Sequence, residues 1–275
     1  MDRPLILVTG ASDGIGLETA RQLAKRGADV IVHGRRAERV EAARADVERQ
    51  AGRAMPKPVV ADLSSLRAVA ALAKQLDSTG VHPTVLVNNA GVYMRELALT
   101  VDGIETTMAV NHFAPFLLTQ SLLAHEGSKL DRIVNVSSVA HSRGSIDLAD
   151  ITFVKRRFTP YGAYAASKLA NVVFTIELAK RLAGRAAVNA LHPGVVSTKL
   201  LTEGFGVRGS DSLEEASATS VFLALDEKVR SITGEYFVAR RKSVMNPEAK
   251  DAAFAKSFFE LSEEVVRAAL ARAAE

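Results

Sequence analysis

The amino-acid sequence predicts a single α/β domain over residues 1–275, built on a doubly wound parallel sheet of about seven strands. Three observations predict this fold. Short apolar runs alternate with longer amphipathic stretches, as in a chain of β-α-β units. The short runs are apolar throughout, which is typical of parallel strands buried on both faces. A glycine-rich turn separates the first run from the first amphipathic stretch.

The predicted strands and helices alternate along most of the chain. We expect strands at residues 5–8, 29–33, 58–61, 85–88, 132–136, 187–191 and 235–238. Helices, each ending near glycine or a polar turn, are expected at 15–26, 36–50, 64–76, 103–123 and 164–182. Right-handed crossovers between parallel strands then place helices on both faces of the sheet.

Two polar loops interrupt this alternation, and a further helix follows them. The loops lie near residues 139–163 and 197–212. Long loops at the carboxyl ends of parallel strands usually shape the ligand site, so we predict that both form the substrate site. A last helix near 247–271 places Phe254, Phe258 and Leu261 at helical spacing. Packing against the body is the first interpretation of this helix, and a dimer contact is the second.

The composition limits the classes of function. Hydrophobic residues make up 48% of the chain, enough for a buried core, and the net charge is only +4. No basic block is long enough to predict nucleic-acid binding, and no apolar run approaches the ~20 residues that span a bilayer. The lack of cysteine excludes disulfides, thiol catalysis and cysteine-ligated metals. We therefore expect a cytoplasmic protein without nucleic-acid or membrane partners.

The turn after the first strand has the form of a phosphate-binding loop, Thr9-Gly10-Ala11-Ser12-Asp13-Gly14-Ile15-Gly16. Gly10 permits a tight reversal, Gly14 lets a pyrophosphate approach the backbone, and Gly16 allows close packing of helix and strand. The helix that follows offers free N–H groups and a partial positive charge to phosphates. The motif predicts a dinucleotide held by Gly10, Ser12, Asp13, Gly14, Ile15 and Gly16.

The end of the second strand indicates which dinucleotide binds. A carboxylate there would accept the adenosine ribose hydroxyls of NAD and repel a 2′-phosphate, but the position is Gly34. Arg35 and Arg36 follow, and guanidinium groups suit phosphate recognition by charge and geometry. We therefore predict NADP(H) in preference to NAD(H), with both arginines at the cofactor. The alternative for Arg36 is a surface residue in the first turn of the helix.

On these and later motifs, the sequence resembles the short-chain dehydrogenase/reductase superfamily from Leu5 to about Val238. The later motifs occur in the family's order and are Asp62-Leu63, Asn88-Asn89-Ala90-Gly91, Asn111, Ser138, Tyr164 with Lys168, and Pro193-Gly194 followed by Thr198. The resemblance implies a Rossmann fold. It also implies an oxidoreductase that interconverts a carbonyl and an alcohol by hydride transfer.

Tyr164 and Lys168 stand four residues apart on a predicted helix. Residues at this spacing share one helix face, which lets the Lys168 ammonium lie near the Tyr164 phenol. An unperturbed tyrosine has a pKa of ~10. We expect the ammonium and the oxidised nicotinamide, both cations, to lower this pKa, so that Tyr164 exchanges a proton with the substrate oxygen near neutral pH. The resemblance also places both residues at the cofactor.

Two further catalytic residues are implied by the resemblance. The Ser138 hydroxyl would hydrogen-bond the substrate oxygen and stabilise its developing charge, and Ser137 is the competing assignment. Asn111 corresponds to the asparagine that supports a water relay toward Lys168 in the family. The alternative is that Asn111 satisfies backbone groups at a helix kink, and the two roles are compatible.

The remaining cofactor contacts also follow from the resemblance. It places Asp62 and Leu63 at the adenine, Asn89, Ala90 and Gly91 along the adenosine, Val196 after Pro193-Gly194 at the carboxamide, and Thr198 at a phosphate. Asn88 either joins these contacts or ties neighbouring strands together. No HExxH motif or clustered ligand spacing is present, so we predict no metal site.

Within the superfamily, the chain looks most like the retinol dehydrogenase-like branch, on Val110-Asn111-His112-Phe113, residues 135–141, 150–157 and 167–171, and Thr233-Gly234-Glu235-Tyr236-Phe237. We expect the substrate pocket to involve His141, Phe153, Val195, Leu200, Leu201 and Phe205. That set favours an apolar or aromatic carbonyl or alcohol. The same residues alternatively form the core of the loops.

Two other functions stay open on the sequence. One is a non-catalytic NADP(H)-binding regulatory or scaffold protein on the same fold, since fold does not fix function. The other is a different reaction on this fold, such as double-bond reduction or epimerisation. The resemblance also implies a homodimer or homotetramer, with helices 103–123 and 164–182 as the elements expected to pair.

Overall fold

A mostly parallel sheet forms the centre of the protein in the computed structural model, as the sequence predicts. The structure describes residues 3–198, 200–206 and 209–272, without the side chains of residues 203 and 205. The order of the eight described strands is β3-β2-β1-β4-β5-β6-β7-β8, and every neighbouring pair is parallel except β7 with β8. The strands are β1 (Leu5–Val8), β2 (Asp29–Gly34), β3 (Val59–Val60), β4 (Val85–Asn88), β5 (Arg132–Val136), β6 (Ala187–His192), β7 (Glu235–Val238) and β8 (Arg241–Lys242).

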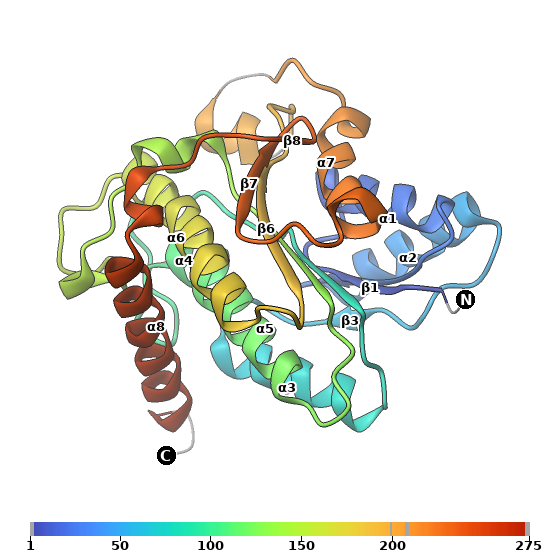
Figure 1. The fold of residues 1–275 in the computed structure, drawn as a ribbon, viewed down its shortest axis with the longest axis horizontal. Helices are drawn as coiled ribbons and strands as arrows, with labels where there is room; N and C mark the ends of the chain where they lie inside the picture. Colours follow the sequence, from blue (N-terminus) through green and yellow to red (C-terminus); the bar gives the residue numbers. More distant parts are fainter. Residues whose placement is uncertain (1–2, 199, 207–208, 273–275) are drawn as a thin grey trace.

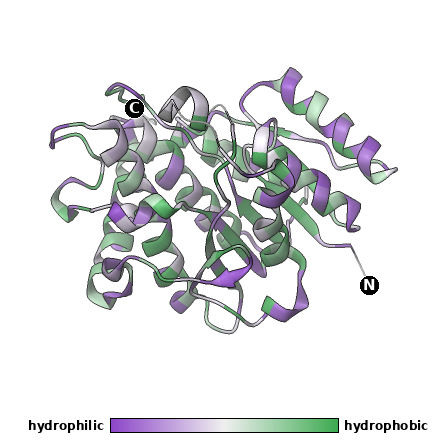
Figure 2. Cartoon of the chain, turned by 90° about the horizontal axis from the view of Figure 1, so that it is seen from above, coloured by the Kyte–Doolittle hydropathy of each residue, from purple (hydrophilic) through white to green (hydrophobic). Residues whose placement is uncertain are grey.

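Helices cover both faces of the sheet (Figure 1). One face carries α1 (Gly14–Lys25), α2 (Ala37–Ala51) and α7 (Leu213–Leu225). The other face carries α3 (Leu66–Ser78), α4 (Thr106–Met108), α5 (Ala114–Ala124), α6 (Pro160–Arg181) and α8 (Ala252–Arg272). Figure 2 shows the hydrophobic residues concentrated on the central strands.

The sheet separates two apolar cores. In β1, Leu7 belongs to the core under α3, α5 and α6, whereas Ile6 and Val8 belong to the core under α1 and α2. Successive residues of a strand point to opposite faces, so a strand covered on both sides must be apolar at every position. This double burial explains why the strand sequences show no alternation of apolar and polar residues.

The order of the strands reverses at β1. This strand pairs with β2 on one side and with β4 on the other. Their connections therefore leave toward opposite faces of the sheet and open a crevice between the loops that follow β1 and β4. The glycine-rich turn lies on one side of this crevice.

The predicted helix over residues 103–123 is interrupted. It consists of α4, a π-helical turn at Ala109–Phe113, and α5. Asn111 lies in the π turn, where its amide donates to the Val92 carbonyl at 3.0 Å and its oxygen accepts from the Val92 N–H at 2.7 Å. A π turn is a common site of a helix kink. The role of Asn111 in satisfying backbone groups at a kink is therefore confirmed.

Among the described α-helices and strands, α7 and the short antiparallel β8 were not predicted from the sequence. Helix α7 lacks an apolar stripe because Ser217, Thr219 and Ser220 are buried beside its apolar residues. Its start is marked instead by a capping box between Ser212 and Glu215. The predicted helix over 247–271 splits into a 3₁₀ turn at Pro247–Lys250 and α8.

Helix α8 packs against the body of the domain, along α6 and beside α5 (Figure 1). The Phe259 ring lies 4.9 Å from that of Phe116 in α5, and the Arg181 guanidinium of α6 lies 3.9 Å from the Phe259 ring. The first interpretation of this helix is therefore confirmed. Helix α8 also covers part of α5 and α6, the two helices expected to pair in a dimer. No helix among the described residues is long and apolar enough to cross a membrane.

We expect Phe258→Ala to destabilise the protein strongly. Phe258 is fully buried, and its ring lies 4.8 Å from that of His112. Truncating a buried phenylalanine leaves a cavity and costs about 3–5 kcal/mol in free energy of unfolding. Urea denaturation measures this change. The control is Lys256→Ala on the exposed side of the same helix, expected within about 0.5 kcal/mol of wild type. Equal stability of the two variants would show that α8 is not docked as described.

Candidate active site

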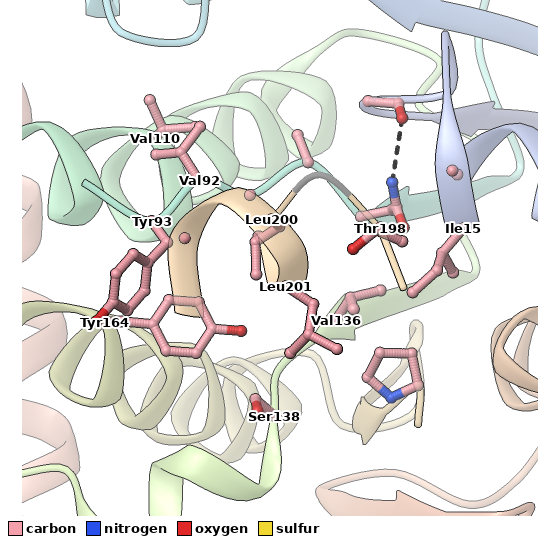
Figure 3. A pocket seen from close by; sticks show the side chains of 18 of the residues that line it. Ile15, Val92, Tyr93, Val110, Val136, Ser138, Tyr164, Thr198, Leu200 and Leu201 are labelled. Atoms are coloured by element: carbon pink, nitrogen blue, oxygen red, sulfur yellow. Dashed lines mark hydrogen bonds between the residues drawn. The ribbon is translucent and has the colours of Figure 1, made fainter. Parts of the chain in front are cut away.

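A large pocket opens at the carboxyl ends of the strands, in the crevice beside β1 and β4. Its volume is about 1480 Å³. Pockets for single small molecules measure roughly 300–1,000 Å³, so this one has room for a dinucleotide and a substrate together. Ile15 and Thr198 lie toward one end of the view in Figure 3, and Tyr93 and Tyr164 toward the other.

Close backbone approach makes the glycines of the turn necessary. Gly10 has a φ of +65°, and a Cβ atom there would lie 2.8 Å from the Ala90 Cα. A Cβ on Gly16 would clash with the Gly10 carbonyl. The His33 ring accepts a hydrogen bond from the Gly10 N–H at 3.3 Å, and burial lowers the pKa of His33 to about 4. A neutral histidine therefore holds the turn in place.

The position of the turn and its open backbone suit a phosphate group. Asp13 caps the start of α1 and accepts from the Gly14 N–H at 2.8 Å. Gly14 has a φ of +55°, and a Cβ there would meet only Thr198 Cγ2, at 3.5 Å. The backbone is thus open toward the pocket at the start of a twelve-residue helix, where a partial positive charge favours an anion.

The end of β2 carries basic side chains and has no space for an acid. A Cβ on Gly34 would lie 2.8 Å from Val40 Cγ2 and 3.0 Å from the Ser12 hydroxyl. The exposed Arg35 lies 4.0 Å from the Asp62 carboxylate. Sequence analysis missed Arg39, which also lines the pocket and lies 3.4 Å from Asp13. Its place three residues after Arg36, on the helix predicted over residues 36–50, was the available signal.

The structure brings all the predicted cofactor-binding residues to the wall of this one pocket. They are Gly10, Ser12, Asp13, Gly14, Ile15, Gly16, Arg35, Arg36, Asp62, Leu63, Asn89, Ala90, Gly91, Tyr164, Lys168, Pro193, Gly194, Val196 and Thr198. Asn88 is different. Its buried amide donates to Asn135 at 2.9 Å and to Thr119 at 3.1 Å. It therefore ties β4 to β5 and α5, the second of the two roles left open for it.

Ser138, Tyr164 and Lys168 meet at the other end of the pocket. Ser138 caps a 3₁₀ turn at Val139–Arg143, directly after β5. Tyr164 is buried in α6, and its phenol forms a hydrogen bond with the Ser138 side chain. The Ser137 hydroxyl instead donates to the backbone carbonyl of Lys168 at 2.7 Å. The geometry therefore favours Ser138 over Ser137 as the serine that faces the reaction.

The protein alone does not lower the pKa of Tyr164, in contrast to the sequence-based expectation. Burial raises this pKa to about 12, and the hydrogen bond with Ser138 opposes the rise only in part. The Lys168 ammonium lies 5.6 Å from the centre of the Tyr164 ring and donates to the Val136 carbonyl at 3.0 Å. Tyr164 is consequently a protonated phenol at neutral pH in the structure described.

Lys168 is buried without a carboxylate partner among the described residues. Burial lowers its pKa from 10.5 to about 8. The ammonium form still predominates at neutral pH, because pH 7 lies below this value. A positive charge is thus held next to the Tyr164 ring and on the wall of the pocket.

Asn111 lies behind the pocket wall. A methyl group on Gly91 would lie 3.4 Å from both Asn111 Oδ1 and Lys168 Nζ. The Asn111 amide also donates to the Ser167 hydroxyl at 3.0 Å. Asn111 is therefore a neighbour of Lys168, but it lies outside the set of lining residues, and the water relay remains a prediction.

The predicted substrate residues divide into two groups. Val195, Leu200 and Leu201 line the pocket. His141 does not, because its ring Nδ1–H donates to the Ser138 carbonyl at 2.7 Å and the ring packs on Tyr236. Phe153 does not either, since it is buried in a loop core under Arg156. For these two the loop-core alternative is correct, and the side chain of Phe205 lies outside the described residues.

Tyr93 is a lining residue that sequence analysis missed. Its ring lies 5.5 Å from that of Tyr164 (Figure 3). It follows the Asn88–Gly91 motif by two positions, and nothing in the local sequence separates a tyrosine that faces a site from one that faces solvent. Only the fold of the loop after β4 places it beside Tyr164.

A group of possible metal ligands lies elsewhere, near the ends of α3 and α5. Asp77, His82 and His125 each place one ligand atom within 4.8 Å of the others. Asp77 and His82 are close in the sequence, but His125 belongs to a different segment, so their spacing gave no motif. None of them lines the pocket, and they have no part in its chemistry.

The fold and the pocket define a dinucleotide-binding α/β protein with a serine, a tyrosine and a lysine gathered at one end. Comparison with known families identifies it further. The sequence pattern of the family described as short chain dehydrogenase matches residues 4–205. The chain belongs to this family.

Individual relatives agree with this membership. Human retinol dehydrogenase 13 is 37% identical over 281 residues, covering 95% of this chain and 84% of the relative. Bovine retinol dehydrogenase 12 is 37% identical over 272 residues, with coverage of 95% and 86%. These matches bear out the expected similarity to the retinol dehydrogenase-like branch.

Solved structures share the fold over most of this chain. An uncharacterised protein from Mycobacterium paratuberculosis superposes with a TM-score of 0.79 at 32% identity, covering 97% of this chain and 96% of that one. A short chain dehydrogenase from Escherichia coli CFT073 complexed with NADPH gives a TM-score of 0.69 at 29% identity, with coverage of 88% and 98%.

We expect Lys168→Met to stabilise the protein at neutral pH. Between pH 8 and 10.5 the unfolded chain binds more protons at this residue than the folded protein, so the burial penalty is full below pH 8 and is relieved as the pH rises toward 10.5. Methionine has no such penalty, and the gain at pH 7 should be about 1–3 kcal/mol.

Urea denaturation of variant and wild type at pH 7 and pH 10 measures the difference, which should shrink at the higher pH. Lys256→Met, at an exposed position, is the control and should show no such trend. A Lys168→Met protein that is less stable than wild type at both pH values would contradict the assignment of a buried ammonium.

Proposed function

We propose that the protein is an NADP(H)-dependent oxidoreductase that interconverts a carbonyl and an alcohol on an apolar or aromatic small molecule. One observation carries the proposal. Ser138, Tyr164 and Lys168 meet on the wall of the same pocket that begins at the glycine turn. The retinol dehydrogenase relatives, whose names describe alcohol oxidation, support the same reaction class.

Each side chain has a distinct role in this proposal. The nicotinamide, when bound, supplies or accepts the hydride. Ser138 donates a hydrogen bond to the substrate oxygen and stabilises the charge that develops there. Tyr164 is protonated at neutral pH and gives its phenolic proton to that oxygen in reduction, and it takes the proton back in oxidation.

Lys168 stabilises the phenolate that Tyr164 becomes when it gives up its proton. A phenolate is costly to form at a buried site, since burial raises the pKa of Tyr164 to about 12. The ammonium 5.6 Å from the ring offsets this cost, and a bound oxidised nicotinamide adds a second cation nearby. The intact set of three residues also favours an enzyme over a non-catalytic scaffold.

The preference for NADP(H) rests on the charges at the end of β2. Arg35, Arg36 and Arg39 line the pocket there, and the crowding around Gly34 excludes the acidic side chain that would favour NAD. Similar structures were determined with NADPH or NADP, including a short chain dehydrogenase from Burkholderia cenocepacia at 28% identity and a TM-score of 0.67.

We also propose that the enzyme works in the cytoplasm.

We expect Tyr164→Phe to abolish turnover and keep NADPH binding. Phenylalanine fills the same space but has no proton to transfer, and the loss should be at least about 10³-fold in kcat. Oxidation of NADPH is followed with a panel of aromatic and aliphatic aldehydes and ketones, and NADPH binding by its fluorescence. Turnover within tenfold of wild type would show that another group transfers the proton.

We expect Arg35→Ala to weaken binding of NADPH by about tenfold while binding of NADH changes little. The reason is that Arg35 would contact the 2′-phosphate, which NADH lacks. Titration of both cofactors into wild type and variant measures the four dissociation constants. Arg26→Ala removes an exposed arginine outside the pocket and is the control for net charge. Equal affinity of the wild type for both cofactors would refute the preference.

A further inference from the structure

The charged residues of the pocket are divided between its two ends. Its acidic side chains within the described part of the chain, Asp13 and Asp62, both lie at the end that carries the glycine turn. Beyond Tyr164, the charged lining residues with described side chains are Arg95 and Arg143. The substrate end is therefore positive and has no described acid to neutralise it.

Arg95 and Arg143 also differ from Arg35 and Arg39 in their partners. Arg35 lies 4.0 Å from Asp62, and Arg39 lies 3.4 Å from Asp13. Neither Arg95 nor Arg143 has a hydrogen bond or ion pair from its side chain to any described residue. Two guanidinium groups at the substrate end are thus available to a ligand.

The neighbours of these arginines relate them to Tyr164 and Ser138. Arg95 follows Tyr93 by two residues and acts electrostatically on its phenol, and the Tyr93 ring lies 5.5 Å from that of Tyr164. About one aromatic ring therefore separates the Tyr164 side chain from the neighbourhood of Arg95. Arg143 is the last residue of the 3₁₀ turn that Ser138 caps, so it belongs to the same part of the pocket wall as Ser138.

The part of the pocket beside Tyr164 is apolar. Val110, Leu200 and Leu201 line it together with the two tyrosine rings (Figure 3). Such walls suit a ring or a short hydrocarbon chain and offer nothing to a highly polar one. A ligand that fits both features has an apolar middle and an anionic end.

We propose that Arg95 and Arg143 form an anion subsite, and that the substrate is an amphipathic carbonyl or alcohol whose apolar or aromatic body ends in a carboxylate. The inference rests on the proposed function and names its substrate class. Guanidinium groups bind carboxylates by charge and by paired hydrogen bonds, and such pairs gain strength when the ligand displaces water from the pocket. The positive end, which has no acid among the described side chains, also attracts anions during encounter.

Binding to the protein–NADPH complex tests the subsite without requiring turnover. The probes are 3-phenylpropanoate and its uncharged counterpart 3-phenylpropanamide, titrated by calorimetry. We expect the carboxylate to bind about tenfold more tightly than the amide in wild type. Arg95→Gln and Arg143→Gln should each remove most of this preference and leave the affinity for the amide within about twofold.

Arg157→Gln is the matched control. Arg157 is an exposed arginine of the neighbouring loop that does not line the pocket, and its change alters the net charge equally. It should keep the preference for the carboxylate. Equal binding of the two probes by wild type, or the same loss in all three variants, would overturn the anion subsite and leave only a general electrostatic effect.

Turnover of 3-(4-formylphenyl)propanoate and its methyl ester then separates this inference from the proposed function. We expect the acid to have the higher kcat/KM and Arg95→Gln to reverse the order. If the ester is the better substrate in wild type, the subsite is wrong but the reaction class stands. If no carbonyl of a broad panel is reduced although the carboxylate probe binds, the proposed function fails and the subsite remains.

Discussion

The active end of the pocket depends on one buried ammonium group. Lys168 is held inside the protein by a single described hydrogen bond to the Val136 carbonyl, and burial lowers its pKa toward neutrality. The group is therefore a net cost to folding, because a hydrophobic side chain would have no charge to desolvate. The same charge stabilises the phenolate form of Tyr164. Stability and function are opposed at this residue, as is common in catalytic sites.

The binding end of the pocket depends on backbone contact instead of charge. Gly10 and Gly16 let the turn lie against Ala90 and against itself, closer than any side chain permits. Asn89 fixes this approach with hydrogen bonds to the Thr9 and Gly10 carbonyls. The binding end therefore depends on close backbone packing, and the active end depends on a buried charge. The parallel sheet brings the two ends together because β1, β4 and β5 all end at the same edge.

Most of the fold and the cofactor end of the site could be predicted from the sequence. Apolar runs predict strands that are buried on both faces. Glycines at a fixed spacing predict a turn whose backbone lies too close to its neighbours for a side chain. Elements whose stability comes from tertiary contacts could not be predicted. Helix α7 buries small polar residues in place of an apolar stripe, and β8 has only two residues. Tyr93 and Arg95 join the site through the geometry of the loop after β4, and His141 is held outside the pocket by its hydrogen bond to the Ser138 carbonyl.

Helix α8 supplies the last piece of the larger core, since Phe258 and Phe259 pack among rings from earlier helices. On the ribosome, this helix is made after every other described element. Until it emerges, Phe116 and Phe174 lack their covering side chains and stay exposed in the nascent chain. The domain can therefore complete its folding only after α8 has left the ribosome, and a chain synthesised only up to α8 presents an exposed apolar surface that chaperones would recognise.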